Sequence, residues 1–210
     1  VETGVGGRID PTNIIQNPAL TIITTVFYDH MATLGDTLEK IAYHKAGIMK
    51  PDVPSICGFQ RPEVEDVLLQ EAKKIGVPLQ LFGKHFGVQR SIKGLRYEAA
   101  EIQYDLPEPA LLGDHQIMNA GLAIAALETL PHITLNKRHY AKGMKVANWP
   151  ARLERITDGD CTTDLPKDTE LWMDGGHNPS AGYAIRLVAD EWSKHDDKPL
   201  YIIFGATEGK

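Results

Sequence analysis

The sequence predicts an α/β fold in two units, and two observations indicate it. Apolar runs rich in β-branched residues alternate with helix-type patterns, beginning with a predicted strand over residues 19–26 and a predicted helix over residues 35–42. Such runs are typical of parallel strands that are buried on both faces of a sheet. The chain also has 210 residues, 42% of them hydrophobic, which is enough for one large core or two small ones.

The strand-then-helix order continues through the first unit. Residues 54–58 read as a short strand, residues 61–75 as an amphipathic helix that ends at Gly76, and residues 77–82 as the next strand. Because the order repeats, we expect these strands to lie in one largely parallel sheet.

The pattern then changes. Short alternating stretches over residues 87–106 predict an antiparallel hairpin inserted at an edge of the sheet. Apolar residues at helical spacing predict a helix over residues 115–130, ended by Pro131, and a further helix is expected over residues 136–147.

A link over residues 149–154 is the predicted domain boundary, which divides the chain into residues 1–149 and 150–210. In the second unit we expect three elements: a strand over residues 170–174, a helix over residues 180–192 and a strand over residues 200–204, followed by a loop. The chain opens inside what reads as a strand end, so we expect it to be part of a longer protein.

Composition excludes several classes. The net charge of −6 and the absence of a basic cluster with interleaved aromatic residues disfavour a nucleic-acid partner. No apolar run is long enough for a membrane span, so no membrane partner is expected. Cys57 and Cys161 lie far apart and outside any zinc-type spacing, which favours two reduced cysteines in a cytoplasmic protein.

Three residues form the strongest candidate site: Glu2, His30 and Lys45. Each follows a predicted strand end or lies at a helix turn, where open α/β sheets bind ligands. A carboxylate and an imidazole suit a divalent cation, and Asp29 lies within reach in the sequence. A protonated lysine beside a metal ion would be repelled, so Lys45 must be neutral or modified into an anion. Taken singly, each residue is also compatible with an ordinary surface role.

Other polar residues are candidates for a second part of the binding site. Gln116 and Asn119 share one face at a helix start, where amides bind a base edge or a phosphate, although simple helix-start polarity explains them equally well. Arg152, in the link, suits a phosphate clamp between closing domains or a solvated linker position.

Asp174 and His177, between a strand and a helix, could hold a ribose or orient a substrate carboxylate. Capping of that helix by Asn178 and Ser180 would explain the turn without a ligand. The chain has no P-loop and no nucleophile elbow.

Taken in order, six motifs resemble the folylpolyglutamate synthase and dihydrofolate synthase family of the Mur-ligase superfamily. The motifs are E-x-G-x-G-G-R-x-D-x-T-N at residues 2–13, D-H-x-x-x-L-G at 29–35, K-A-G-I-x-K at 45–50, H-Q-x-x-N-A at 115–120, A-R-L-E at 151–154 and D-G-G-H-N-P at 174–179. Residues 170–179 look most like bacterial members, many of which are bifunctional.

The resemblance implies part of a Mur-ligase central ATPase-type domain over residues 1–149 and the start of a Rossmann-like C-terminal domain over residues 150–210. It implies an ATP-dependent amide ligase that phosphorylates a carboxylate of dihydropteroate or of a (tetrahydro)folyl-polyglutamate. L-Glutamate then attacks the acyl phosphate, and ADP and phosphate are released. The family's P-loop lies upstream of Glu2, and its C-terminal domain continues past Lys210.

The resemblance also implies site roles and cofactors. The expected cofactors are ATP and Mg²⁺, with K⁺ as an additional candidate, and the full-length protein is expected to be a monomer. The implied roles are metal binding for Glu2, His30 and a carbamylated Lys45, catalysis for Lys45, His30 and Arg152, ATP binding for Gln116, Asn119, Arg152, Asp174 and His177, and folate binding for Asp10, Thr12 and Asn13.

Two alternatives remain open at this point. One is a Mur-type peptidoglycan ligase, which the motifs at residues 2–13 and 45–50 disfavour. The other is a non-catalytic remnant that binds a folate, against which the intact Glu2, His30 and Lys45 argue.

Overall fold

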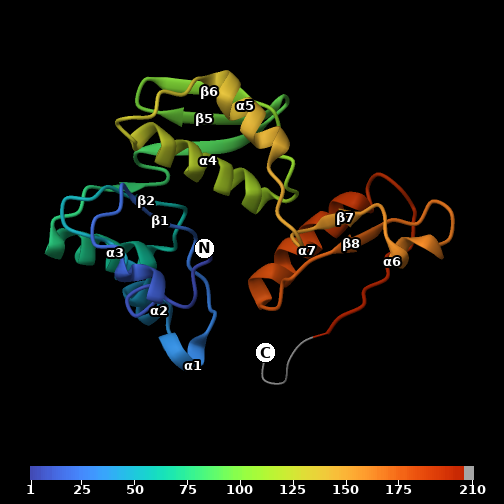
Figure 1. The fold of residues 1–210 in the computed structure, drawn as a ribbon, viewed down its shortest axis with the longest axis horizontal. Helices are drawn as coiled ribbons and strands as arrows, with labels where there is room; N and C mark the ends of the chain where they lie inside the picture. Colours follow the sequence, from blue (N-terminus) through green and yellow to red (C-terminus); the bar gives the residue numbers. More distant parts are fainter. Residues whose placement is uncertain (206–210) are drawn as a thin grey trace.

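The computed structural model describes residues 1–205 and has the predicted α/β character. In the first unit, three short parallel strands form a sheet in the order β1–β2–β3. These are β1 (Thr21–Ile23), β2 (Ser55–Cys57) and β3 (Leu79–Leu81). Helices α2 (Leu38–Ala46) and α3 (Pro62–Ile75) pack on one face, and α4 (Asp114–Thr129) covers the other (Figure 1).

The central strand β2 shows why this sheet is parallel and covered on both faces. All three of its residues are buried. Ile56 belongs to the core shared with α4, whereas Cys57 belongs to the core shared with α2 and α3. Burial raises the pKa of the Cys57 thiol to about 11. The apolar character of residues 54–58 is therefore needed on both sides of the sheet, as the sequence predicts.

Local capping sets where the flanking helices begin and end. The Thr37 side chain accepts a hydrogen bond from the Lys40 amide at the start of α2, and Gly76 ends α3 in the left-handed conformation that glycine adopts without strain. Helix α2 runs four residues beyond its predicted end at residue 42, to Ala46. This extension places Lys45 in the last helical turn.

The predicted hairpin is wrong in two respects. Residues 86–106 form three antiparallel strands, and they make a sheet of their own instead of joining the edge of the parallel one. The strands are β4 (Phe86–Ser91), β5 (Gly94–Ala99) and β6 (Ile102–Leu106). The reason is α4, whose apolar residues lie between the two sheets and pack against Val88, Leu95 and Tyr97.

Gly94 is the tightest point of this antiparallel sheet. Its φ is +123°, and a Cβ there would collide with backbone atoms of Leu106, Pro107 and Glu108. We expect Gly94→Ala to lower the free energy of unfolding by about 2 kcal/mol, because neither the backbone nor the packing can accept a methyl group. Gly87→Ala in β4 is the matched control, since a Cβ there meets no atom within 4 Å. Thermal unfolding of both variants checks this, and equal melting temperatures would contradict it.

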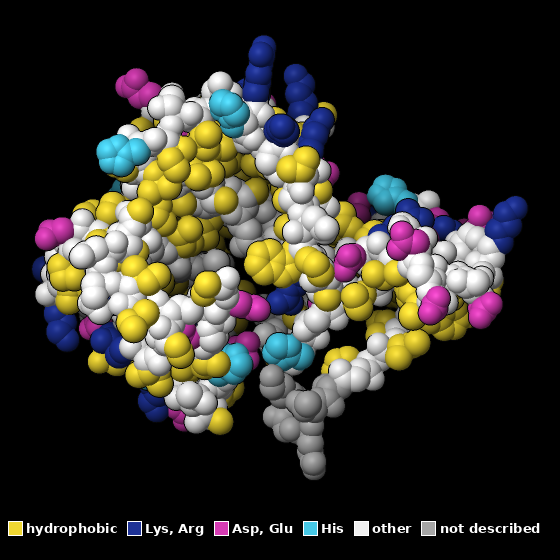
Figure 2. Space-filling view, in the orientation of Figure 1, with side chains coloured by type: hydrophobic (Ala, Val, Ile, Leu, Met, Phe, Trp, Pro, Cys, Tyr) yellow, Lys and Arg dark blue, Asp and Glu magenta, His cyan; other side chains and the backbone are white. Residues whose placement is uncertain are grey.

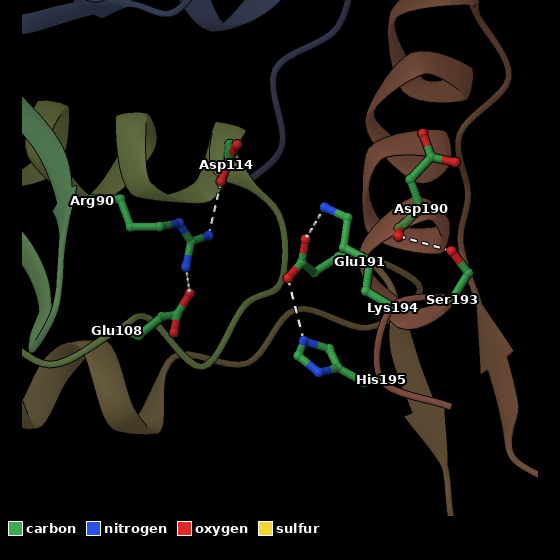
Figure 3. Close-up of polar contacts among 8 residues, drawn as sticks. All are labelled: Arg90, Glu108, Asp114, Asp190, Glu191, Ser193, Lys194 and His195. Carbon is green, nitrogen blue, oxygen red and sulfur yellow. Dashed lines mark hydrogen bonds and ion pairs between the residues drawn. The ribbon is translucent and has the colours of Figure 1, made fainter. Parts of the chain in front are cut away.

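Ion pairs fix the start of α4. Arg90 of β4 pairs with Asp114, at 2.8 Å, and with Glu108 (Figure 3). Asp114 also lies in the first turn of α4, where the helix dipole favours an acid. The next helix, α5 (Lys137–Val146), starts at a capping box made by Asn136 and His139.

The second unit is smaller and lies beside the first (Figure 1). Its sheet consists of β7 (Glu154–Ile156) and β8 (Leu171–Met173), paired antiparallel. Helix α6 (Asp160–Thr163) lies between these strands in the chain, and α7 (Pro179–Trp192) follows them. In the last turn of α7, Glu191 pairs with Lys194 and His195, which follow the helix (Figure 3).

The strand predicted over residues 200–204 is wrong. These residues have no regular secondary structure, and all five are exposed. Their apolar sequence suits a strand, but no ladder of hydrogen bonds pairs them with another described strand. The predicted loop that follows lies mostly outside the described residues.

Two short helices, η1 (Pro11–Ile14) and α1 (Met31–Leu34), complete the first unit. None of the helices within residues 1–205 is both long and apolar enough to cross a bilayer. The helices and sheets of the first unit end before residue 149, and the β7–β8 sheet begins after it. The domain boundary at residue 149 stays a prediction.

Candidate active site

A cavity of about 630 Å³ lies between the two units, and the molecular surface is hollowed there (Figure 2). One wall is the first half of α4 with Ile22 and Thr24 from the end of β1, and the other is formed by the link and α7. Four of the sequence-predicted residues line this cavity: Gln116, Asn119, Arg152 and Asp174. Residues that are 58 positions apart in the chain, Gln116 and Asp174, thus face one space.

The α4 wall presents amides. Asn119 Nδ2 donates to Gln116 Oε1 at 3.2 Å, so the two side chains are already oriented toward each other on one face of the helix. Gln116 NH₂ and Asn119 Oδ1 are left to bind a ligand. His115, beside them, has its pKa lowered by burial and by the Arg152 charge, against the opposing charge of Asp174.

Asp174 holds the link in place. Its Oδ2 accepts from the Leu153 amide at 2.9 Å and its Oδ1 from the Gly176 amide at 2.6 Å, while the Gly175 amide donates to Ala151 O at 2.8 Å. Ala151 and Leu153 have φ values of 55° and 46°, a left-handed conformation that costs energy outside glycine. The carboxylate of Asp174 therefore stabilises the strained turn that carries Arg152.

Arg152 lines the cavity and its side chain is available to a ligand. Within residues 1–205, no carboxylate lies within ion-pair distance of its guanidinium. An exposed guanidinium without an anionic partner beside two amides suits an anionic oxygen ligand such as a phosphate.

A second group of polar residues, Asp29, His30 and Lys45, lies where the segment after β1 approaches the last turn of α2. His30 is left-handed, with φ 50° and ψ 36°, and its amide donates to Asp29 Oδ1 at 2.8 Å. Lys45 in α2 is partly buried; burial lowers the pKa of its amine, and the charge of Asp29 opposes this shift. Asp29 thus lies next to His30 and acts electrostatically on Lys45, and a joint site of His30 and Lys45 stays a prediction.

Asn178 joins this group to the second unit, which the sequence did not indicate. It is the N-cap of α7, accepting from the Ala181 amide at 2.9 Å, which confirms the cap predicted at Asn178; the cap predicted at Ser180 is wrong, because Ser180 lies inside the helix. Its Nδ2 also donates to Asp29 Oδ2 at 2.9 Å. Burial raises the pKa of Asp29, but the hydrogen bonds from Asn178 and the His30 amide outweigh this effect and lower it.

His177, the residue before Asn178, is exposed, and its Nδ1 lies 3.1 Å from Gly175 O. Its charge also acts on Asp29. His177 therefore lies on the side of the loop that faces the Asp29 group, whereas it does not line the cavity with Arg152.

The predicted folate-binding residues are engaged in the fold of the N-terminal loop. Asp10 is buried and accepts from the Thr12 amide and hydroxyl, at 2.9 and 2.6 Å, which lowers the pKa of its carboxyl group. Asn13 Nδ2 donates to Gly47 O at 3.1 Å, just beyond α2. These contacts hold the loop against the end of α2, so a folate-binding role for these three residues stays a prediction.

Glu2 is exposed near the start of the chain. No group of three or more His, Cys, Asp or Glu side chains within residues 1–205 is arranged to hold a metal ion. The predicted set contains only two residues of these types, Glu2 and His30. Its third member is Lys45, which could provide a metal ligand only after modification.

The comparisons with known proteins bear on the family. No protein-family model matches the chain. The dihydrofolate synthase/folylpolyglutamate synthase of Bacillus subtilis is 35% identical over the whole chain. The folylpolyglutamate synthase of Lacticaseibacillus casei is 33% identical, again over the whole chain. The chain spans 48% of the length of each of these relatives.

Solved structures agree with the sequence relatives. A folylpolyglutamate synthase in complex with AMPPCP and folate matches with a TM-score of 0.81 at 30% identity, covering 95% of this chain and 48% of that one. The similarity therefore extends over both units and includes the residues that line the cavity. By sequence and by its Mur-ligase-like fold, the chain belongs to the folylpolyglutamate synthase and dihydrofolate synthase family.

Proposed function

We propose that the full-length protein is an ATP-dependent ligase that joins L-glutamate to dihydropteroate, to a (tetrahydro)folyl-polyglutamate, or to both. The observation that carries this is the cavity between the units, which presents the amides of Gln116 and Asn119 on one side and, on the other, Arg152, which no carboxylate of the described residues pairs with. Family membership supports the reaction class, and a relative solved with AMPPCP and folate supports both ligand types.

In this proposal the cavity binds ATP. Gln116 and Asn119 hydrogen bond to polar atoms of the nucleotide, and Arg152 binds its phosphate oxygens. Asp174 keeps the turn of Arg152 in place through the amides of Leu153 and Gly176, so its contribution is to position the guanidinium. This differs from direct ATP binding by Asp174, which stays a prediction, as does the proposed contact of His177 with ATP.

Mg²⁺ fits the predicted set of Glu2, His30 and Lys45 if Lys45 is a carbamate. A neutral Lys45 amine would attack CO₂ and lose a proton to solvent, and the product carries anionic oxygens. Partial burial favours the neutral amine by lowering its pKa. Glu2, His30 and the Lys45 carbamate would then hold the ion. When bound, Mg²⁺ neutralises phosphate charge and supports transfer of the terminal phosphoryl group. K⁺ as an additional cation stays a prediction.

Exclusion of water is the remaining requirement, because an acyl phosphate is readily hydrolysed. The cavity has Leu122, Trp149 and Ile185 among its walls, and these apolar side chains from both units reduce water access.

We further propose a cytoplasmic monomer, since all the proposed site residues belong to one chain and both described cysteines are free thiols.

The proposal is tested by incubating the full-length protein with ATP, Mg²⁺, L-glutamate and either dihydropteroate or tetrahydrofolate. We expect mass spectrometry to detect a product larger than the pteroyl substrate by one glutamyl residue. Binding of folate without any glutamylated product would instead indicate a non-catalytic protein.

The similarity to folate ligases leaves the peptidoglycan-ligase alternative without support.

A further inference from the structure

One polar contact joins the two units. Among all hydrogen bonds and ion pairs within residues 1–205, the bond from Asn178 Nδ2 to Asp29 Oδ2, at 2.9 Å, is the single one that connects residues 1–149 with residues 150–205. The partners are 149 positions apart in the sequence. An apolar contact accompanies it, because Val188 of α7 lies against Gly113 before α4.

Both side chains of this bond are held in place from their own unit. Asn178 uses its Oδ1 to cap α7, accepting from the Ala181 amide, so that its Nδ2 is the atom left to point across. Asp29 uses Oδ1 to accept from the His30 amide, which leaves Oδ2 for Asn178. The two residues therefore meet with little remaining rotational freedom, which lowers the entropic cost of the bond.

The position of the bond matters for the chemistry. Asp29 is adjacent to His30 and acts electrostatically on Lys45, whereas Asn178 follows the loop of Asp174 that positions Arg152. An apolar contact such as that of Val188 has no preferred direction, but a hydrogen bond does. The Asp29–Asn178 bond can thus fix how the Arg152 side of the cavity lies relative to the Lys45 group.

We propose that Asp29 and Asn178 are a positioning pair that sets the closed arrangement of the two units, in which Arg152 and Lys45 act on the same substrate. As a statement about the reaction, this rests on the proposed function. As a statement about the arrangement of the units, it does not.

The test relies on a substitution that keeps the N-cap of α7 but removes the hydrogen bond to Asp29. Asn178→Asp keeps an oxygen for the Ala181 amide, and Asp is as good an N-cap as Asn, so α7 should stay folded. The Nδ2 donor is replaced by a carboxylate oxygen that faces Asp29. The double variant Asp29→Asn with Asn178→Asp restores one donor and one acceptor with the roles exchanged, at unchanged net charge. Asn136→Asp, at the N-cap of α5, is the matched control without a partner in the other unit.

Two measurements on the full-length protein decide the outcome. Pulsed electron paramagnetic resonance reports the distance between spin labels on Cys161, which is exposed, and on an introduced Lys73→Cys in α3, with any other exposed cysteine replaced by serine. Steady-state kinetics report kcat and KM for ATP. We expect Asn178→Asp to broaden the distance distribution and to lower kcat about tenfold, with KM for ATP changed less than about threefold, as for loss of a hydrogen bond to a charged group.

The double variant should recover the narrow distance distribution of the wild type and a higher kcat than Asn178→Asp, and Asn136→Asp should change neither readout. A wild-type distribution in Asn178→Asp, or a double variant as broad as the single one, would overturn the positioning role. If the wild-type protein shows no ligase activity, the proposed function fails, and the distance measurement still decides whether the pair joins the units.

Discussion

Lys45→Ala in the full-length protein is expected to lower kcat about a thousandfold, comparable to the loss of a key electrostatic group from an active site. As a carbamate, Lys45 would add a second anionic group to the carboxylate of Glu2 and would complete a set of three ligands with His30. Alanine removes them and leaves a space at the end of α2. The measurement is the rate of ADP formation under saturating substrates.

Added short carboxylic acids should partly restore the activity of Lys45→Ala, because a small carboxylate can occupy the place of the carbamate, and the wild type should lose activity when bicarbonate and CO₂ are removed. The matched control is Lys40→Ala on the same helix, whose exposed ammonium pairs with Asp36 at the surface. Wild-type rates in Lys45→Ala would end the carbamate hypothesis.

Arg152→Ala should lower kcat by about 10- to 100-fold, which corresponds to about 1.4–2.7 kcal/mol in the activation free energy. The reason is that Arg152 lines the cavity and has no carboxylate partner among residues 1–205, so its charge is available to the phosphate groups as charge shifts during transfer. Folding should be unaffected, because no ion pair within residues 1–205 depends on this side chain.

Arg155→Ala is the control for Arg152, since Arg155 lies three residues further on and pairs with Glu170 across the β7–β8 sheet at 3.0 Å. It should leave kcat unchanged. Unchanged turnover in Arg152→Ala, or a melting temperature far below that of Arg155→Ala, would show that Arg152 serves the structure of the link instead.

The sequence predicted the elements whose signals are local. The helix over residues 115–130 and the helix ended by Gly76 were found within one residue of α4 and α3, because apolar spacing and a left-handed glycine are properties of a few neighbouring residues. Strand extents were less accurate: residues 19–26 are apolar or β-branched throughout, yet only Thr21–Ile23 have partners in the ladder.

Errors arose where a strand depends on a distant partner. Residues 200–204 have the composition of a buried strand but pair with nothing described, and β7 was not predicted at all because its residues, Glu-Arg-Ile, are mostly polar. The third strand of the β4–β6 sheet was missed because Ala99 and Ile102 are joined by a turn without a strong sequence signal.

In the site, too, features with local signals were predicted and contacts between distant residues were not. Local motifs drew attention to four polar residues that line the cavity, among them Gln116 and Arg152. They did not indicate that Asp174 would bind the amides of the link or that Asn178 would reach Asp29, because both contacts depend on the path of the chain through space.

The central claim is transfer of the terminal phosphoryl group of ATP onto a carboxylate of the pteroyl substrate. The most direct measurement is the identity of the nucleotide product in the presence and absence of that substrate, with Mg²⁺ and L-glutamate in both reactions. Because the resulting acyl phosphate must be captured by an amine while water is excluded, we expect ADP and phosphate in the complete mixture and little ADP when the pteroyl substrate is omitted. AMP and pyrophosphate as products, or rapid ATP hydrolysis without a pteroyl substrate, would contradict this account.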